Sequence, residues 1–112
     1  MDVVAYEKMV EELSLFKNEI PQEQWLFYCA LGLGGESGEY LEKLKKNLRD
    51  HGGIISEDQR RLMLLELGDV FFYLVANAKR LGSNLEEVAD MNRAKLLARR
   101  AAGTIKGSGD ER

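Results

Sequence analysis

Cysteine, histidine and proline each occur only once in the 112 residues, at Cys29, His51 and Pro21. A single cysteine excludes an internal disulfide and any cysteine-rich zinc site. Because there is also only one histidine, cysteine–histidine catalysis and histidine-rich metal sites are nearly excluded. Whatever chemistry this chain performs must therefore come from carboxylates, amines and the backbone.

The chain also lacks a large excess of charge and a long uninterrupted apolar run. Its net charge is −3, from 16 basic and 19 acidic residues, which argues against broad electrostatic binding to nucleic acid or to anionic lipid. The most apolar stretch, residues 62–76, is interrupted by Glu66, Gly68 and Asp69 and is shorter than the roughly 20 residues that a helix needs to span a bilayer. The start at Met1 shows no signal-peptide pattern, so we expect a cytoplasmic protein that does not contact a membrane.

What is present is the composition of one ordinary globular domain, with 45% hydrophobic and 31% charged residues. We expect a single domain over residues 1–112. No stretch alternates with the period of a strand, whereas apolar residues recur at helical spacing. Ser56 with Gln59, and Ser83 with Glu86, read as capping boxes. The sequence predicts an all-α four-helix bundle, with helices at about 2–17, 22–49, 57–81 and 84–102 and a Gly-rich tail at 103–112.

The third of these helices is apolar on every side. Twelve of the fifteen residues from Leu62 to Ala76 are apolar, and a helix that is apolar all round must be buried all round. Four helices of this length cover a central one only partly. We therefore expect part of its surface to meet another subunit in a homo-oligomer, either a dimer or a tetramer.

Two matched pairs of acids are the sharpest feature of the sequence. Glu36 and Glu39 lie in the second helix, Glu66 and Asp69 in the third, and each pair is spaced three residues apart on one helical face. If the two helices pack antiparallel, the pairs face each other as a cluster of four carboxylates. No Lys or Arg lies within the apolar stretch around the second pair to neutralise it.

Such a cluster repels itself unless a cation is present, and hard oxygen ligands select Mg²⁺ or Mn²⁺. The competing interpretation is that one or both pairs point to solvent on amphipathic helices. A di-iron carboxylate site is a poor fit, because it needs a Glu-x-x-His on each of two helices and His51 lies in a predicted loop.

The pattern Glu36-x-x-Glu39, 26 residues, Glu66-x-x-Asp69 resembles the MazG-type nucleoside triphosphate pyrophosphohydrolases. The flanking segments 31–35 and 70–73 agree with that family, as does the fourth-helix pattern Asn92-x-x-Lys95-Leu96-x-x-Arg99 and the tail 103–110. The resemblance implies the family's all-α fold and hydrolysis of an NTP or dNTP between its α and β phosphates, giving a monophosphate and pyrophosphate.

The same resemblance implies roles for the acids. All four carboxylates, Glu36, Glu39, Glu66 and Asp69, would hold Mg²⁺, with Mn²⁺ as a possible replacement. Glu39, together with Glu36, is the expected catalytic group, and Glu39 would orient or deprotonate the attacking water. Neutralisation of developing charge and activation of an in-line water are what phosphoryl chemistry needs from such a site.

Further residues on the same helical faces are candidates for binding the nucleotide. Lys43 and Lys46 continue the face of the first acid pair, and Tyr73 lies one turn beyond Asp69. Each has a plain alternative: solvated lysines, and an aromatic that only packs in the core. On the fourth helix the candidates are Asn92, Lys95 and Arg99, of which Arg99 suits phosphate oxygens or a surface ion pair.

Two other interpretations remain open. A helical module that only associates and regulates, while keeping a carboxylate metal site, would explain the apolar third helix. A related pyrophosphatase acting on dUTP, dCTP or phosphoribosyl-ATP would keep the same fold. The glycines at 32, 34, 35 and 38 do not form a P-loop, and we expect them to allow close approach of helices or ligand.

Overall fold

The computed structural model describes residues 1–104 and 106–107. These residues form α1 (Val3–Leu13), two short 3-10 turns (Leu15–Asn18 and Gln22–Gln24), α2 (Trp25–His51), α3 (Glu57–Arg80) and α4 (Leu85–Ala102). No strand occurs within this part of the chain, which confirms the expectation of an all-helical protein with four helices. None of its helices is long and apolar enough to cross a membrane.

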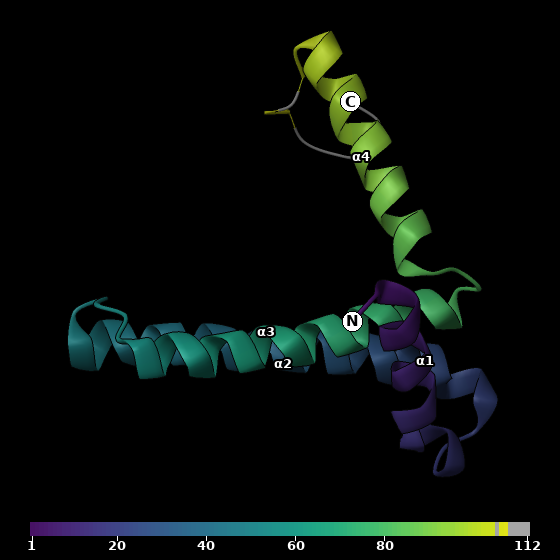
Figure 1. Ribbon diagram of the computed structural model, residues 1–112, viewed down its shortest axis with the longest axis horizontal. Coiled ribbons are helices and arrows are strands. Elements are labelled where there is room, and N and C mark those ends of the chain that lie inside the picture. Colours follow the sequence, from purple (N-terminus) through teal and green to yellow (C-terminus); the bar gives the residue numbers. More distant parts are fainter. Residues whose placement is uncertain (105, 108–112) are drawn as a thin grey trace.

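The two longest helices, α2 and α3, form an antiparallel hairpin that runs the length of the molecule (Figure 1). Gly52 ends α2 with φ of +60°, a left-handed conformation that favours glycine. Ser56 then caps α3, and its hydroxyl accepts a hydrogen bond from the Gln59 amide while the Gln59 side chain accepts one from the Ser56 amide. The predicted capping box is thus confirmed, and it fixes where α3 begins.

Gly32 sets the closest approach of the hairpin helices. A Cβ atom at this position would lie 2.4 Å from the ring of Tyr73 on α3, so only glycine leaves room for that ring. One turn further along α3, the Asn77 amide donates to the Cys29 carbonyl of α2 at 2.8 Å. The expected role of the glycines in close approach is therefore confirmed at Gly32, whereas a Cβ at Gly34 would meet nothing within 4 Å.

Helix α1 crosses α3 at one end of the hairpin and closes the hydrophobic core there. The core consists of five buried residues from α1, the following turn, α2 and α3: Val10, Phe16, Cys29, Val75 and Ala76. Glu7, only 6% exposed, pairs with Lys79 at 3.3 Å. Glu11 accepts a hydrogen bond from Arg80. Because the core lies at this end, the far end of the hairpin is a two-helix extension.

The first helix ends earlier than the sequence indicated. It stops at Leu13 instead of continuing to 17, because the Ser14 hydroxyl bonds back to the Val10 carbonyl at 2.6 Å and the chain turns into a 3-10 segment. The fourth helix is capped by the Asn84 side chain, which accepts from the Glu87 amide at 2.8 Å. The predicted capping box at Ser83 and Glu86 was wrong by one residue.

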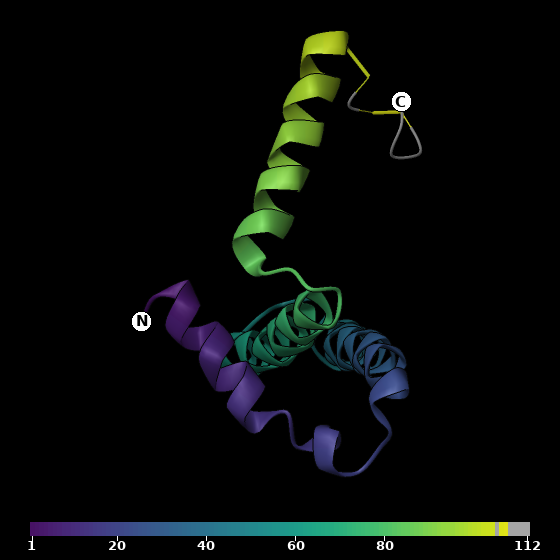
Figure 2. The same cartoon turned by 90° about the vertical axis from the view of Figure 1, so that its right-hand side faces the viewer.

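Helix α4 leaves the hairpin after Gly82 and projects away from it (Figures 1 and 2). The four helices of one chain therefore do not close into a compact bundle, which corrects that part of the sequence expectation. A groove of about 1030 Å³ lies between α1, the end of α3 and the first half of α4. Both the exposed helix and the groove follow from the direction in which α4 leaves Gly82.

Replacing Gly32 by alanine is expected to destabilise the protein by about 1–3 kcal/mol, because the added methyl group overpacks the contact with Tyr73. Replacing Gly34 by alanine, in open space on the same helix, should stabilise it by up to about 1 kcal/mol through helix propensity. Urea unfolding of both variants measures the difference. Equal effects of the two substitutions would contradict a tight helix contact at Gly32.

Candidate metal centre

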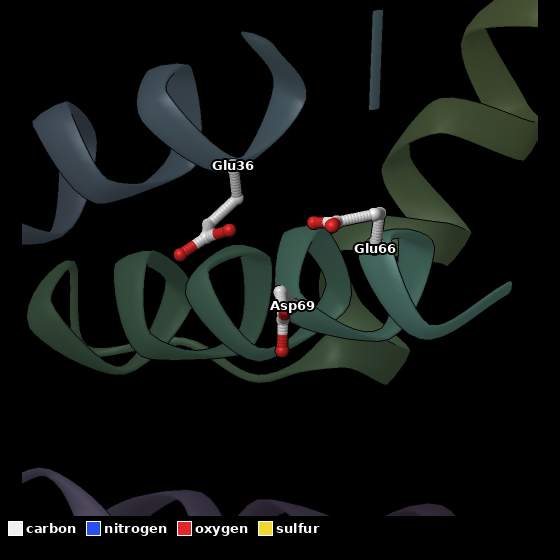
Figure 3. Close-up of side chains that lie close together, drawn as sticks. All are labelled: Glu36, Glu66 and Asp69. Atoms are coloured by element: carbon white, nitrogen blue, oxygen red, sulfur yellow. The ribbon is translucent and has the colours of Figure 1, made fainter. Parts of the chain in front are cut away.

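Three of the four predicted carboxylates come together in the middle of the hairpin. Oxygen atoms of Glu36, Glu66 and Asp69 all lie within 4.8 Å of one another. Glu36 reaches from α2 toward α3, while Glu66 and Asp69 come from successive turns of α3 (Figure 3). Glu36 and Glu66 are half-buried and Asp69 is exposed, so the cluster is anchored in the helix seam and opens to solvent on one side.

The electrostatics of the cluster favour an added positive charge. Desolvation, and then the negative charges of Asp69, Glu66 and Glu39, raise the pKa of Glu36 above its ordinary value. A carboxylate with a raised pKa lies in a surplus of negative potential. A cation bound here would relieve that repulsion and hold Glu36 ionised.

One lysine already neutralises part of this negative charge. The Lys43 ammonium lies 3.4 Å from a carboxylate oxygen of Glu66. No basic residue occurs in the apolar stretch of α3 itself, and the cation comes instead from α2, seven residues beyond Glu36 on the same helical face.

Glu39 lies apart from the three clustered acids. Three residues along an α-helix turn its side chain by about 60° from that of Glu36, and Glu39 is exposed at the rim of the seam. Its charge still contributes to the raised pKa of Glu36. The structure thus brings together three of the four expected ligands, with Glu39 beside them on the solvent side.

The donor set fits a hard divalent cation. All three groups are carboxylates, which are the ligands that Mg²⁺ and Mn²⁺ prefer. Oxygens in one octahedral Mg²⁺ shell lie about 3–4 Å apart, which is compatible with the spacing of these side chains. Among the described residues this is the single group of three or more such side chains close enough to hold an ion.

A hollow of about 310 Å³ adjoins the cluster on the side of the hydrophobic core. It is lined by Glu36, Asp69, Phe72, Tyr73 and Leu13. Burial, followed by the neighbouring Tyr28 hydroxyl, raises the pKa of Tyr73 to about 12. The Tyr73 hydroxyl therefore stays protonated at neutral pH and is engaged by Tyr28 at the edge of this hollow.

On the opposite side of the cluster, toward the hairpin tip, two lysines lie beside an acid, Asp50, and the apolar side chains of Leu62 and Met63. Lys43 and Lys46 line a second hollow of about 170 Å³ together with Asn47, His51 and Gln59. The Asn47 amide donates to Gln59 at 3.0 Å and fixes this part of the seam. His51 is the last residue of α2 instead of a loop residue as predicted.

The predicted residues of the fourth helix do not reach the cluster within one chain. Asn92 lines the groove against α1, Lys95 is half-buried and Arg99 is 6% exposed near the end of α4. Because α4 projects away from the hairpin (Figure 1), these α4 residues lie away from the carboxylates of the same chain.

Two features of the site were not found from the sequence. Tyr28 lies 6.5 Å from Tyr73 between ring centroids and stacks on Phe16 at 4.9 Å, and only the pairing of α2 with α3 reveals this. The Lys43–Glu66 ion pair also crosses the two helices. Its signal was available in the register of the antiparallel hairpin, which places Lys43 about two turns further toward the tip than Glu36.

The fold and the site together define a class: an all-helical protein whose antiparallel hairpin carries three carboxylates suited to a hard cation. The chain belongs to the family of the MazG nucleotide pyrophosphohydrolase domain, whose profile matches residues 28–103. The match contains most of α2 and the whole of α3 and α4. It therefore includes every acid of the candidate site, and confirms the resemblance drawn from the paired acids.

The chain is also similar to the Gene 37 protein of Mycobacterium phage L5. The two are 44% identical over 87 residues, which cover 78% of this chain and 76% of the phage protein. That name states no activity. No solved structure matches the chain.

Proposed function

We propose that this protein is a metal-dependent nucleoside triphosphate pyrophosphohydrolase, which converts an NTP or dNTP to a monophosphate and pyrophosphate. The observation that carries the proposal is the cluster of Glu36, Glu66 and Asp69 within a chain of the MazG nucleotide pyrophosphohydrolase family. A cytoplasmic location, predicted from the sequence, would fit such substrates.

Each side chain of the site has a proposed task. Glu36, Glu66 and Asp69 would hold Mg²⁺ or Mn²⁺, with Glu39 completing the acidic rim. The bound ion would neutralise phosphate charge and lower the pKa of a water molecule. Glu39, exposed beside Glu36, would orient or deprotonate that water, and Glu36 would fix the position of the reacting phosphate through its place in the cluster.

The two ends of the seam suggest the direction of the substrate. The hollow beside the acids has the rings of Phe72 and Tyr73 in its lining, on which the base of a nucleoside would pack. The hollow toward the hairpin tip offers Lys43 and Lys46, which suit the charged β and γ phosphates. We therefore propose that the nucleoside lies toward the core and the leaving pyrophosphate toward the tip.

Alanine at Lys43 or Lys46 is expected to raise the KM for an NTP by about tenfold, since a hydrogen bond to a charged group is worth about 1.5–3 kcal/mol. The matched control is Lys45→Ala, because Lys45 is an exposed lysine of the same helix that pairs only with Glu42 in the structure as described. Steady-state kinetics with one nucleotide compares the three variants. If Lys45→Ala changes KM as much as the other two, the basic end of the seam is not where phosphates bind.

The test of the proposed function is product analysis of the purified protein with a panel of NTPs and dNTPs, with Mg²⁺ and with EDTA. Monophosphate and pyrophosphate that form only with the metal would establish the activity, and the panel would rank bases and sugars. A failure to turn over any nucleotide would favour a regulatory helical module. A thermal shift with millimolar Mg²⁺ or Mn²⁺ then reports whether the carboxylates still bind an ion.

A further inference from the structure

Part of the hollow beside the carboxylates is formed by a residue from outside the hairpin. Of the described residues that line it, Glu36 belongs to α2, and Asp69, Phe72 and Tyr73 belong to α3. The remaining one is Leu13, the last residue of α1. Because α1 lies outside residues 28–103, which the family profile matches, the match assigns nothing to this side chain.

Helix α1 runs along the side of α3 that carries Asp69. The rings of Tyr6 and Phe71 lie 5.0 Å apart between their centroids. Burial, followed by the negative charge of Asp69, raises the pKa of Tyr6. Figure 3 shows Asp69 pointing away from α2, toward the side where the purple ribbon of α1 passes. Leu13 is seven residues from Tyr6, so both lie on the face of α1 that is turned toward the acids.

The backbone on either side of Leu13 is held in place. Val10 is completely buried in the core, and its carbonyl accepts a hydrogen bond from the Ser14 hydroxyl at 2.6 Å. Glu11 accepts a hydrogen bond from Arg80 of α3. The Leu13 side chain itself is 55% exposed. It is therefore free to contact a ligand from a fixed position, and replacing it should change the stability of the fold little.

We propose that Leu13 limits the size of the base in the nucleotide that this protein hydrolyses, and so disfavours purines. The inference rests on the proposed function, in which the nucleoside packs on Phe72 and Tyr73. The acids of the hollow would hold the cation, and Tyr28 engages the Tyr73 hydroxyl. The lining that remains for the base is apolar, so size and shape select the base more than hydrogen bonds do.

The dimensions of the hollow support a role for a single side chain. Its volume is about 310 Å³, at the lower end of the range of about 300–1,000 Å³ for ligand pockets. Shortening or enlarging Leu13 therefore changes a considerable part of the space beside the acids.

Substitutions at Leu13 test the proposal in two directions. Leu13→Ala shortens the side chain and Leu13→Trp enlarges it. The measured quantity is the ratio of kcat/KM for dATP to kcat/KM for dCTP with Mg²⁺, because a general loss of active protein cancels in this ratio. The matched control is Leu15→Ala, since Leu15 is 62% exposed and does not line the hollow. Circular dichroism checks that each variant is helical.

We expect the dATP to dCTP ratio to rise at least about fivefold in Leu13→Ala and to fall at least about fivefold in Leu13→Trp. One methylene group in an apolar pocket is worth about tenfold or more in discrimination, and the exposure of Leu13 reduces that effect. The Leu15→Ala ratio should equal that of the wild type. Hydrolysis with an unchanged ratio in both Leu13 variants would overturn the role of Leu13 and leave the proposed function intact.

Binding distinguishes a failure of this inference from a failure of the proposed function. If the wild type hydrolyses neither nucleotide, calorimetry with the α,β-methylene analogues of dATP and dCTP and Mg²⁺ gives the corresponding ratio of Kd values. Opposite shifts of that ratio in the two Leu13 variants would support the size limit and overturn only the hydrolysis. An unchanged ratio, or a wild type that binds neither analogue, would overturn the inference.

Discussion

Replacing Glu66 by Gln is expected to lower the turnover of a nucleoside triphosphate by at least about 100-fold. Glu66 is half-buried and lies beside Glu36 and Asp69, and an amide cannot supply the negative charge that a divalent cation needs. Loss of the charge stabilisation that a metal gives to the transition state is worth several kcal/mol, and each 1.36 kcal/mol is tenfold in rate. Asp69→Asn should behave in the same way.

A second readout separates metal binding from chemistry. The stabilisation of the wild type by Mg²⁺ or Mn²⁺ in thermal unfolding should disappear in Glu66→Gln, whereas Glu39→Gln should keep most of it and still lose turnover. The control is Glu57→Gln, an exposed acid in the first turn of the same helix α3. Turnover of Glu66→Gln within twofold of this control would show that the cluster does not carry the reaction.

Replacing Arg80 by Met is expected to destabilise the fold by about 2–4 kcal/mol. The Arg80 side chain is 10% exposed, donates a hydrogen bond to Glu11, and lies over the rings of Phe16 and Trp25 at 5.8 and 5.4 Å from their centroids. Methionine fills similar space but loses the contacts with the two rings and the hydrogen bond to the partly buried Glu11, which keeps only Lys17 at 3.0 Å. Urea unfolding measures the loss.

The double variant Arg80→Met, Glu11→Gln provides the control, because it removes both charges together. It should recover part of the lost stability, which a merely steric role of Arg80 would not allow. If the single and double variants were equally unstable, the ion pair would contribute nothing and only the packing of Arg80 would matter.

The same pair predicts a pH dependence. Burial opposes ionisation of Glu11, but hydrogen bonds from Arg80 and Lys17 outweigh it and hold the pKa of Glu11 below its ordinary value of about 4.5. A carboxyl whose pKa is lower in the folded state contributes stability that is present above the unfolded pKa and is lost as the pH falls through the folded one. The difference between wild type and Arg80→Met should therefore shrink below about pH 4.5.

The sequence predicted the parts of the site that depend on spacing within one helix. Pairs of acids three residues apart, in apolar surroundings, were enough to place Glu36, Glu66 and Asp69 in one cluster. The exposed position of Glu39 depends on how far α2 is rotated about its own axis against α3, at a seam where Gly32 packs closely on Tyr73. The spacing of residues within one helix does not reveal how that helix is rotated against its neighbour.

The direction of α4 could not be predicted for a different reason. Periodicity and a Gly82 turn signal showed where the helix begins and ends, but they do not show which surface of the hairpin the helix packs against. The early end of α1 at Leu13 is similar, because the bond from the Ser14 hydroxyl to the Val10 carbonyl competes locally with a helix that the apolar pattern would continue.

The close contact between Gly32 and Tyr73 lies near the carboxylates on both helices of the hairpin. Glu36 lies only one turn from Gly32, and Asp69 one turn from Tyr73, so the carboxylates are about 6 Å from the point where the helices touch. The hairpin tip at Gly52 is twenty residues, or about 30 Å, away. A 10° splay of the helices would thus move the tip by about 5 Å but the acids by only about 1 Å. The cation site would therefore keep its shape under small changes in the angle between the two helices.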